Sequence, residues 1–512
     1  MWQKKHLWLV LGLVILYLIT HIFHLTALPV FADEAIYIRW SQLIIDDWSR
    51  YLFFPLNDGK TPLFVWLMVP FLKVWQDPLF AGRLVSVLVG LVQAGLMVSL
   101  TYQITQKRLS ALTAGILASF LPFWFFHQRM ALMDGLMATW LSLGVLASLK
   151  ISHQVMQKEK KRQIIKWQIV LGLSLGLGFW TKLPMVLGIP MLFLTPFLVD
   201  KKLSINIKHL WPYFIKIAVS VTFGLLIFLL LKLQPAFSQL FGRGGDFLYS
   251  IEDFLAGGWK STLRQWPNYA GVIWFYLTPL VALIPLAGLT TKRAKVHFWL
   301  LMMALSFALP IMLLGKVVYA RYLLPMAIPL TLSAAIGIGD FLDRVQRKNQ
   351  FKLRFLWSLV AVLIVANIIG PVTQNLYYAW FDADHLPLTE ADKIQYLYEW
   401  SSGHGIRQTT DLISSTAKSN RVAVATEGYF GTLPDGILMY LHNRDVSNIK
   451  VEGIGQPVRE ISQEFMINTA SFDQVWLIVN SHRNFLDLEP NQLLTEYCRP
   501  DVDVCLEVWR LR

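Results

Sequence analysis

The sequence predicts a polytopic α-helical membrane protein with a C-terminal soluble α/β or α+β domain. Of its 512 residues, 55% are hydrophobic and only 15% are charged, which is too apolar for an ordinary soluble protein. Up to residue 379 the chain has 35 Lys and Arg against 14 Asp and Glu, whereas the remainder has 11 against 19. The basic excess therefore belongs to the membrane part, where it forms no stripe or arm of the kind that binds nucleic acid.

The first apolar run, residues 7–27, follows Lys4 and Lys5 and is long enough to span a hydrocarbon core of about 20 helical residues. No small-residue cleavage site follows this run, so we interpret it as an uncleaved anchor. The apolar pattern predicts eleven spans in all, the others being near 79–103, 109–126, 131–149, 167–182, 185–199, 211–233, 269–290, 297–314, 322–340 and 355–379.

Two apolar segments need separate treatment. The run from 167 to 199 is too long for one span and is interrupted by Thr-Lys-Leu-Pro at 181–184, which predicts two helices joined by a tight turn. The segment 62–75 is short, contains Pro70 and carries Lys73, which favours an in-plane or re-entrant helix.

The charges of the loops predict the topology. With a cytoplasmic N-terminus and eleven spans, the cytoplasmic loops hold clusters of Lys and Arg, as the positive-inside rule requires. These clusters lie near residues 107–108, 150–166, 201–208, 292–295 and 344–354. The extracytoplasmic face then carries the loop 28–78, the loop 234–268 and the tail, so we expect a multi-pass plasma-membrane protein of the cell envelope.

Residues 1–380 form the predicted transmembrane domain, and residues 381–512 form the predicted soluble one. In this tail TEADKIQYLYEWSS has a helical pattern, whereas 421–426, 474–480 and 505–511 are typical of strands. Cys498 and Cys505 are either free thiols or a disulfide that closes a short hairpin on an oxidising face. The glycines of FGRGGDF indicate a flexible linker in loop 234–268 rather than an active-site lid.

The stretch 31–66 concentrates groups that could carry chemistry. Asp33 and Glu34 are adjacent carboxylates just after the first span, and Lys60 follows in a Gly-Lys-Thr-Pro turn. Each has a plain structural alternative, because Asp33 could cap a helix beginning at Glu34, and Lys60 could be a solvated loop residue.

Other ionisable residues fall at the same predicted face, where charges near apolar segments are costly and often functional. They are Arg83, His127, Arg129, Asp134, Lys182, Lys316 and Arg321. Individually these basic residues could snorkel to the interface, and Asp134 could simply pair with His127 or Arg129. Their joint occurrence favours a functional site.

Sugar transfer from a lipid-linked phosphate is a chemistry that needs this set. A carboxylate would accept the proton of an acceptor hydroxyl, while Lys or Arg would neutralise the phosphate as it leaves. Membrane helices would hold the polyprenyl chain.

Several short motifs together resemble the GT-C glycosyltransferases, in particular the protein O-mannosyltransferase and aminoarabinose transferase group. They are DEAIY, GKTPLFVW, AGRLVSVLVG, RMALMDGLMA, WTKLP and ARYLLPMAIP, and the resemblance covers residues 1 to about 380. It implies a GT-C-like membrane domain, a polyisoprenyl-phosphate sugar donor and an inverting transfer.

The resemblance also implies residue roles. Asp33 matches the family's catalytic aspartate and Glu34 its neighbour, while Lys60 matches a phosphate-contacting lysine, with Thr61 inserted before Pro62. Substrate-binding positions are expected at Arg129, Asp134, Lys182, Arg321 and Tyr322. The predicted partners are the lipid-linked donor, the membrane and a lipid, glycan or protein acceptor, without nucleic acid.

Two alternatives stay open. A transporter or flippase of lipid-linked saccharide would use the same charges to line a path, and in a purely structural role they would only anchor helices. No cofactor is required by this interpretation, although Asp33, Glu34 and Asp134 offer oxygen ligands for a divalent cation.

Overall fold

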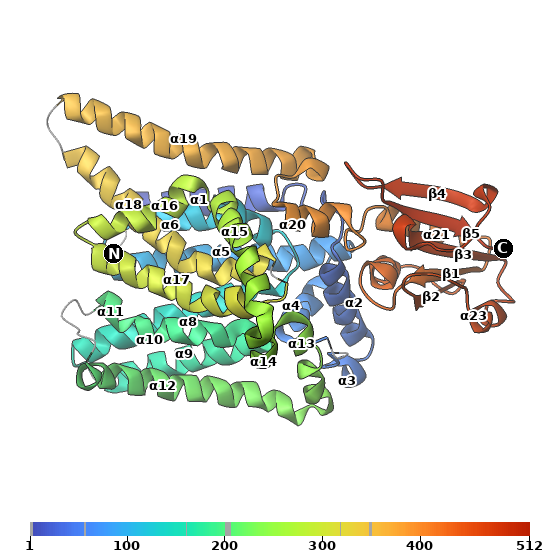
Figure 1. The fold of residues 1–512 in the computed structure, drawn as a ribbon, viewed down its shortest axis with the longest axis horizontal. Helices are drawn as coiled ribbons and strands as arrows, with labels where there is room; N and C mark the ends of the chain where they lie inside the picture. Colours follow the sequence, from blue (N-terminus) through green and yellow to red (C-terminus); the bar gives the residue numbers. More distant parts are fainter. Residues whose placement is uncertain (1–3, 56–57, 160, 200–205, 318, 348–350) are drawn as a thin grey trace. The chain divides into compact units, whose positions relative to one another are not determined.

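The computed structural model describes residues 4–55, 58–159, 161–199, 206–317, 319–347 and 351–512 (Figure 1). The chain forms two compact units that alternate along the sequence. The first, which we call the helical unit, comprises Met1–Ile22, Phe53–Phe64 and Ser86–Leu376. The second, the sheet unit, comprises Phe23–Leu52, Val65–Val85 and Tyr377–Arg512.

Among the residues that the structure describes, six helical segments are long and apolar enough to cross a membrane, so the chain is an integral membrane protein. Two bent helix pairs raise this number to eight if each pair is one span. The six are Pro78–Thr105 (α5), Met133–Met156 (α8), Lys161–Thr181 (α9), Lys208–Leu233 in α12 (Ile207–Leu229) and its 3₁₀ extension, Ala294–Leu314 (α17) and Ala320–Arg344, mostly α18 (Leu324–Arg347). The predicted count of eleven is not confirmed.

Further helices account for most of the other predicted spans. The N-terminal helix is α1 (Lys4–Ile22), and the last long helix is α19 (Phe351–Phe381). The predicted span 109–126 is a bent pair, α6 (Arg108–Phe120) and α7 (Pro122–Gln128), with an angle of 56° between them. Pro122, at the start of α7, has no backbone N–H and cannot donate the hydrogen bond that would continue α6.

The predicted span 269–290 is not one straight helix. It runs from α15 (Trp259–Tyr276) into α16 (Pro279–Ala287), and the two are bent by 103°. Thr278 has a left-handed φ of 67°, and Pro279 lacks an amide proton, so the helical hydrogen bonds stop here.

The break at 181–184 is present as predicted, because α9 ends at Thr181. Beyond it, 185–199 is a broken segment rather than a single helix. It contains a 3₁₀ helix Leu183–Gly188, α10 (Ile189–Leu194) and α11 (Pro196–Val199). The prolines at the first turns of these pieces explain the interruptions.

The segment 62–75 forms α4 (Leu63–Leu72), whose ten residues extend about 15 Å and are too short to span a bilayer. The segment 234–268, for which the glycines predicted a flexible loop, is largely helical. It contains a 3₁₀ helix Pro235–Phe241, α13 (Gly244–Phe247), α14 (Ile251–Asp253), a π-helical turn Phe254–Gly258 and the start of α15. Four of its glycines lie within these helical pieces, Gly244 and Gly245 in α13 and Gly257 and Gly258 in the π-helical turn.

Helices α8, α9 and α12 run side by side in the helical unit (Figure 1). Glycines allow α9 and α12 to approach closely, since a Cβ placed on Gly176 would lie 2.5 Å from Cβ of Ile227. A Cβ placed on Gly224 of α12 would lie 2.6 Å from Cβ of Leu175 and 3.0 Å from the carbonyl oxygen of Gly172. Close packing of small residues is a main source of helix association in membranes, where no hydrophobic effect acts between helices.

An ion-pair network joins loops that were predicted to be cytoplasmic. Nζ of Lys107, between α5 and α6, lies 2.8 Å from Oδ1 of Asp340 in α18, and Nε of Arg293, before α17, lies 3.0 Å from Oδ2 of the same residue. The loops at 107–108 and 292–295 therefore meet at one end of the helical unit. This agrees with their predicted placement on a common side.

The sheet unit contains a five-stranded sheet in the order β2-β1-β3-β5-β4 (Figure 1). Strands β1 to β3 are parallel, and β5 runs antiparallel to both β3 and β4. The strands are Val422–Glu427 (β1), Ile449–Gly455 (β2), Gln474–Asn480 (β3), Leu493–Cys498 (β4) and Cys505–Arg510 (β5). The three predicted strands are confirmed as β1, β3 and β5.

Helices of the sheet unit come from both ends of the chain. From the tail come α20 (Glu390–Lys393) with a π-helical turn Ile394–Tyr398, as the TEADKIQYLYEWSS pattern predicted, then α21 (Ile406–Thr416), α22 (Ile437–Leu441) and α23 (Gln463–Asn468). From the N-terminal part come α2 (Ala32–Asp46) and α3 (Trp48–Tyr51).

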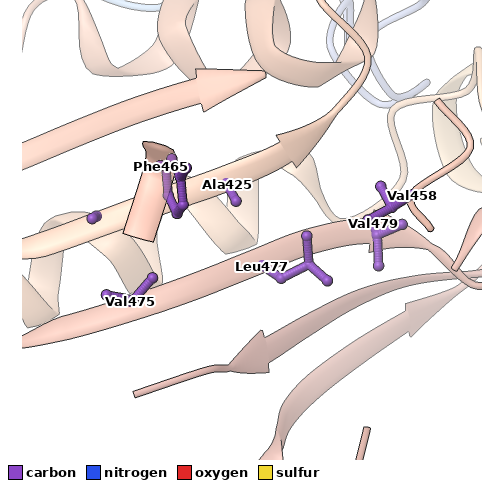
Figure 2. Close-up of a cluster of buried hydrophobic side chains, with 7 residues drawn as sticks. Ala425, Val458, Phe465, Val475, Leu477 and Val479 are labelled. Atoms are coloured by element: carbon purple, nitrogen blue, oxygen red, sulfur yellow. The ribbon is translucent and has the colours of Figure 1, made fainter. Parts of the chain in front are cut away.

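One core of the sheet unit lies on a face of the central strands. Figure 2 shows Phe465 of α23 with Ala425 of β1 and with Val475, Leu477 and Val479 of β3, all buried. The alternate residues of β3 point to this face because side chains in a strand alternate in direction. This packing holds α23 against the parallel strands.

Cys498 and Cys505 are directly opposite each other on β4 and β5 and form a disulfide. The hairpin disulfide was one of the two alternatives for these residues, and the free-thiol alternative is wrong.

Asp435 provides a pH-dependent element in the sheet unit. It lies in a π-helical turn, Thr432–Gly436, and Oδ2 accepts a 2.8 Å hydrogen bond from the Gly431 amide. Burial raises the pKa of the Asp435 carboxyl to about 6, and the Gly431 hydrogen bond only partly opposes this. The fold therefore favours the protonated carboxyl relative to the unfolded chain.

This stability contribution should be full below pH about 4 and lost as the pH rises through about 6. We expect Asp435→Asn to be roughly neutral at pH 4 and to stabilise the protein by roughly 1–3 kcal/mol at pH 7, because the neutral amide avoids a buried charge. Thermal unfolding of the full chain in detergent at both pH values measures this. Asp445→Asn, at an exposed carboxylate of the same unit, is the control, and an equal effect of both substitutions would contradict the prediction.

Candidate functional site

Asp33 lies in the first turn of α2 and is half-buried. The helix begins at Ala32, with Phe31 in the N-cap position, so the alternative that Asp33 caps a helix starting at Glu34 is wrong. A carboxylate in the first turn is stabilised by the positive end of the helix dipole. Its role as a general base is not tested by these contacts and remains a prediction.

Glu34 is fully buried and forms a two-pronged ion pair with Arg83 of α5. Arg83 Nε lies 2.8 Å from Oε1 of Glu34, and Nη2 lies 2.7 Å from Oε2. Oε2 also accepts a 3.0 Å hydrogen bond from the Phe31 amide. The carboxylate oxygens of Glu34 are thus engaged in holding the start of α2, which favours a positioning role.

The guanidinium of Arg83 also organises the loop before α2. It donates to the carbonyl oxygens of Leu25, Leu28 and Pro29 at 2.9, 2.8 and 3.0 Å. All of these groups are in the sheet unit. Arg83 was singled out in the sequence because it is a charged residue near an apolar segment. In the structure it holds the loop before α2 through these hydrogen bonds.

The tail contributes directly to the same place. The Ala32 amide donates to the Ser401 carbonyl at 2.9 Å, and the Gly403 amide donates to the Val30 carbonyl at 2.8 Å. Further along α2, Nε2 of Gln42 donates to the Met439 carbonyl at 2.9 Å. The backbone that presents Asp33 is therefore hydrogen-bonded to the tail on both sides of its helix start.

A second cluster lies in the helical unit, where the ends of three helices meet. Asp134, in the first turn of α8, is buried and lies 2.6 Å from Nζ of Lys182, the residue that follows α9. The Lys182 ammonium is 4.6 Å from the ring centroid of Tyr322, just before α18. Three residues predicted from separate motifs are thus in contact, and we call them, with Arg321, the cationic cluster.

Arg321 is buried and lies over two tyrosine rings, 5.2 Å from the centroid of Tyr319 and 5.5 Å from that of Tyr322. Lys60 lies 3.6 Å from Asp58, which also pairs with Arg243 at 2.6 Å. Burial lowers the pKa of the Lys182 ammonium, Asp134 opposes this shift, and the positive charges of Arg321 and Lys60 lower the pKa further.

Arg129 and His127 are engaged elsewhere. Nη1 of Arg129 donates to the carbonyl oxygens of Thr20 and His21, at 3.1 and 2.8 Å, where α1 ends. A cation at a helix C-terminus satisfies carbonyls that have no intrahelical partner. Nδ1 of His127 lies 2.8 Å from the Phe123 carbonyl within α7. These contacts give both residues a structural role, and substrate binding by Arg129 stays a prediction.

Lys316, also expected at this face, donates to the Gly245 carbonyl at 2.6 Å and lies over Tyr249. Sequence reasoning missed Asp58, Arg243 and Tyr319. Asp58 precedes Lys60 by two residues and Tyr319 precedes Arg321 by two, so proximity along the chain was the available signal.

Two of the three carboxylates proposed as ligands of a divalent cation, Glu34 and Asp134, already have cationic partners. Arg83 engages Glu34, and Lys182 engages Asp134. Among the described residues, the group with metal-ligand spacing is Glu496, Cys498 and Cys505, whose cysteines are in the disulfide. Metal dependence remains a prediction for a chelator experiment.

Comparison with known proteins gives consistent matches. Residues 46–241 match the family described as dolichyl-phosphate-mannose-protein mannosyltransferase. The chain is 24% identical over 357 residues to the undecaprenyl phosphate-alpha-4-amino-4-deoxy-L-arabinose arabinosyl transferase of Wigglesworthia glossinidia brevipalpis, covering 68% of this chain and 61% of that protein. The alignment thus spans less than two thirds of that relative.

Solved structures give the fold. ArnT from Cupriavidus metallidurans in the apo state superposes with a TM-score of 0.59 at 14% identity, covering 99% of this chain and 98% of that one. The same protein bound to undecaprenyl phosphate gives 0.58, with 98% of both chains covered. The chain resembles the GT-C glycosyltransferases. The resemblance predicted from the motifs is confirmed, and the likeness of fold to ArnT extends over the tail, for which the motifs gave no match.

Removing one partner of the Glu34 and Arg83 pair should be costly. Glu34→Ala leaves a buried guanidinium without its carboxylate, and such losses cost about 3–5 kcal/mol. We expect a large decrease in the thermal midpoint of the purified protein. Glu390→Ala, at an exposed carboxylate that pairs with Lys393, should change it little. Equal stability of Glu34→Ala and the wild type would contradict this account of α2.

Proposed function

We propose that the protein is a membrane glycosyltransferase that moves a monosaccharide from a polyisoprenyl-phosphate donor to an acceptor hydroxyl on the extracytoplasmic face. The cationic cluster is the observation that carries this proposal. A lysine and an arginine, held by Asp134 and two tyrosines at the ends of membrane-spanning helices, suit the phosphate of a lipid whose chain lies in the membrane.

The activities for which similar proteins are named support this donor class. The curated relative from Wigglesworthia glossinidia brevipalpis is named as an undecaprenyl-phosphate arabinosyl transferase. The structure of ArnT from Cupriavidus metallidurans is described as bound to undecaprenyl phosphate. A polyprenyl-phosphate sugar is therefore the donor we propose for this chain.

In the proposed reaction, Asp33 accepts the proton of the acceptor hydroxyl. The acceptor oxygen forms a bond to the anomeric carbon as the bond from that carbon to the phosphate oxygen breaks, and the configuration inverts. The electron pair leaves with the lipid phosphate, whose negative charge is neutralised by Lys182 and Arg321, with Lys60 adding positive charge. Glu34 has a positioning role in this reaction, because its carboxylate keeps α2 in place through Arg83.

Two observations support the extracytoplasmic orientation. The ion pairs of Asp340 gather loops with the Lys and Arg excess that marks a cytoplasmic side. Asp340 lies near the C-terminal end of α18, whereas Tyr322 of the cationic cluster lies just before its N-terminal end. The helix separates the two residues by roughly 25 Å. The disulfide of the tail fits an oxidising compartment, which is the second observation.

The alternative of a lipid-linked saccharide flippase uses charges along a transport path. The cationic cluster lies instead at helix ends, around the first turn of α8, the residue after α9 and the turn before α18. This placement favours chemistry at the membrane surface. Proteoliposomes with a labelled donor separate the two functions, because a flippase moves the lipid without forming a glycosylated product.

Asp33→Asn should leave the protein folded and lower kcat for transfer from a labelled polyprenyl-phosphate sugar by roughly 10²–10⁴-fold, because general-base catalysis contributes about that much. Asp46→Asn, at the other end of α2, is the matched control. Asp46 pairs with His442 at 2.8 Å and is half exposed, so we expect near-normal turnover. Normal kcat in Asp33→Asn would rule out the assigned base.

Lys182→Met should lower kcat/KM for the donor by roughly 10²-fold, because it removes a preorganised cation from the leaving phosphate. Lys316→Met is the control, since that lysine contacts Gly245 and Tyr249 instead of Asp134. Donor titrations at two salt concentrations provide the measurement. If both substitutions weaken transfer equally, general surface charge and not the cationic cluster holds the phosphate.

A further inference from the structure

The order of the strands marks one position in the sheet unit as a ligand site. Strand β1 lies between β2 and β3 in the sheet. The connection that leaves β1 leads to β2 on one side of it, whereas the connection that leaves β3 leads towards β4 and β5 on the opposite side. The two connections therefore diverge at the carboxyl ends of β1 and β3. In parallel sheets of α/β proteins, ligands bind at this switch point. Here the two strands end at Glu427 and Asn480.

Buried polar groups gather at this switch point. Glu427 accepts hydrogen bonds from the Asn480 amide at 2.9 Å and from its Nδ2 at 2.6 Å. Arg499, inside the disulfide-closed hairpin, donates to Oδ1 of Asn480 and to the Ser402 carbonyl, and only 4% of it is exposed. Its Nε has no hydrogen-bond partner among the described residues. A buried donor without a partner is costly, and a polar ligand would satisfy it.

A second guanidinium extends the polar surface outward. Arg483, just after β3, lies 3.6 Å from Glu427 and 4.4 Å from the ring centroid of Trp400. It also donates to Oε1 of the exposed Gln456 at 3.2 Å. The guanidinium of Arg483 and the side-chain amide of Gln456 therefore lie close to the Trp400 ring, near the carboxyl ends of β1 and β3.

The loop after β1 presents two more aromatic side chains. Tyr429 is 70% exposed and Phe430 is 47% exposed. They lie between Gly428 and Gly431, whose φ values of 72° and 110° suit glycine, and the Gly428 amide is anchored to the Gly455 carbonyl at 2.9 Å. Adjacent exposed aromatic residues on an anchored loop are typical of a binding surface.

This loop also borders the start of α2. A Cβ on Gly431 would lie 3.3 Å from the Trp400 ring and 3.8 Å from Cβ of Ala32, the residue before Asp33. Oγ1 of Thr432 donates to the Trp400 carbonyl at 2.7 Å. A ligand on the loop would therefore be beside the helix turn that carries the proposed base.

We propose that the carboxyl ends of β1 and β3, with the Gly428–Gly431 loop, bind the saccharide portion of the acceptor. This inference rests on the proposed function, since it supplies that reaction with its second substrate. Aromatic faces stack on the apolar C–H face of a pyranose, while Arg483, Gln456 and the orphaned Nε of Arg499 are suited to its hydroxyls. The site thus combines the two kinds of contact that a sugar requires.

Saturation-transfer NMR on the full chain in lipid nanodiscs tests the site without any need for turnover. The probes are the methyl glycosides of glucose, mannose and N-acetylglucosamine. We expect saturation transfer to at least one, and roughly tenfold weaker binding in the Tyr429→Ala/Phe430→Ala double variant and in Arg483→Gln. Ile467→Ala removes an equally exposed apolar side chain in α23, before β3 begins, and should leave binding unchanged.

The result for Asp33→Asn separates this inference from the proposed function. Binding that persists in Asp33→Asn supports the site whether or not transfer is lost there, and loss of transfer alone bears only on the base. The inference is overturned if none of the three glycosides binds the wild type, or if binding is the same in the wild type and in both loop and Arg483 variants. Thermal unfolding of each variant confirms that the comparison concerns folded protein.

Discussion

The buried ion pair of Glu34 and Arg83 is the interaction on which the presentation of Asp33 depends. One guanidinium binds both carboxylate oxygens and three backbone carbonyls before α2, so α5, the preceding loop and the helix start are fixed together. Buried pairs of this kind are weak evidence for stability but can specify one arrangement. Here the arrangement specified is the direction of the first turn of α2, which carries Asp33.

The same pair shows why the roles of Asp33 and Glu34 could not be distinguished from the sequence alone. Adjacent carboxylates at a membrane surface look alike in a sequence, and the partner that distinguishes Glu34 is 49 residues away in α5. Asp134 and Lys182, which form an ion pair, could be singled out in the sequence because each lies at the end of an apolar run, where an ionisable residue is conspicuous. The sequence predicts which charges matter near a membrane, whereas their division into positioning and chemical roles requires tertiary contacts.

The fold shows a similar limit. Strands β1 and β3 were predictable because both are continuous apolar runs of a buried parallel sheet, whereas β2 and β4 are edge strands with half-buried residues. The disulfide was left open because spacing does not give geometry. The bend at Thr278 was missed because a positive φ at a non-glycine residue has no reliable sequence signal, although Pro279 beside it does.

In the sheet unit, the tail is hydrogen-bonded to α2, the helix that carries Asp33. Segments 23–52 and 65–85 fold with the tail, and α2 is tied to it by the Ala32, Gly403 and Gln42 hydrogen bonds. A domain that served only as a cover would not need backbone hydrogen bonds to the turn that carries Asp33. Loops in general are mobile, whereas a general base must be held within hydrogen-bond reach of the proton that it accepts. The hydrogen bonds between α2 and the tail fix the position of the first turn of α2, which a surface loop alone would not do. The acceptor site proposed on the same unit, next to Ala32, would hold the acceptor hydroxyl close to Asp33, the proposed base.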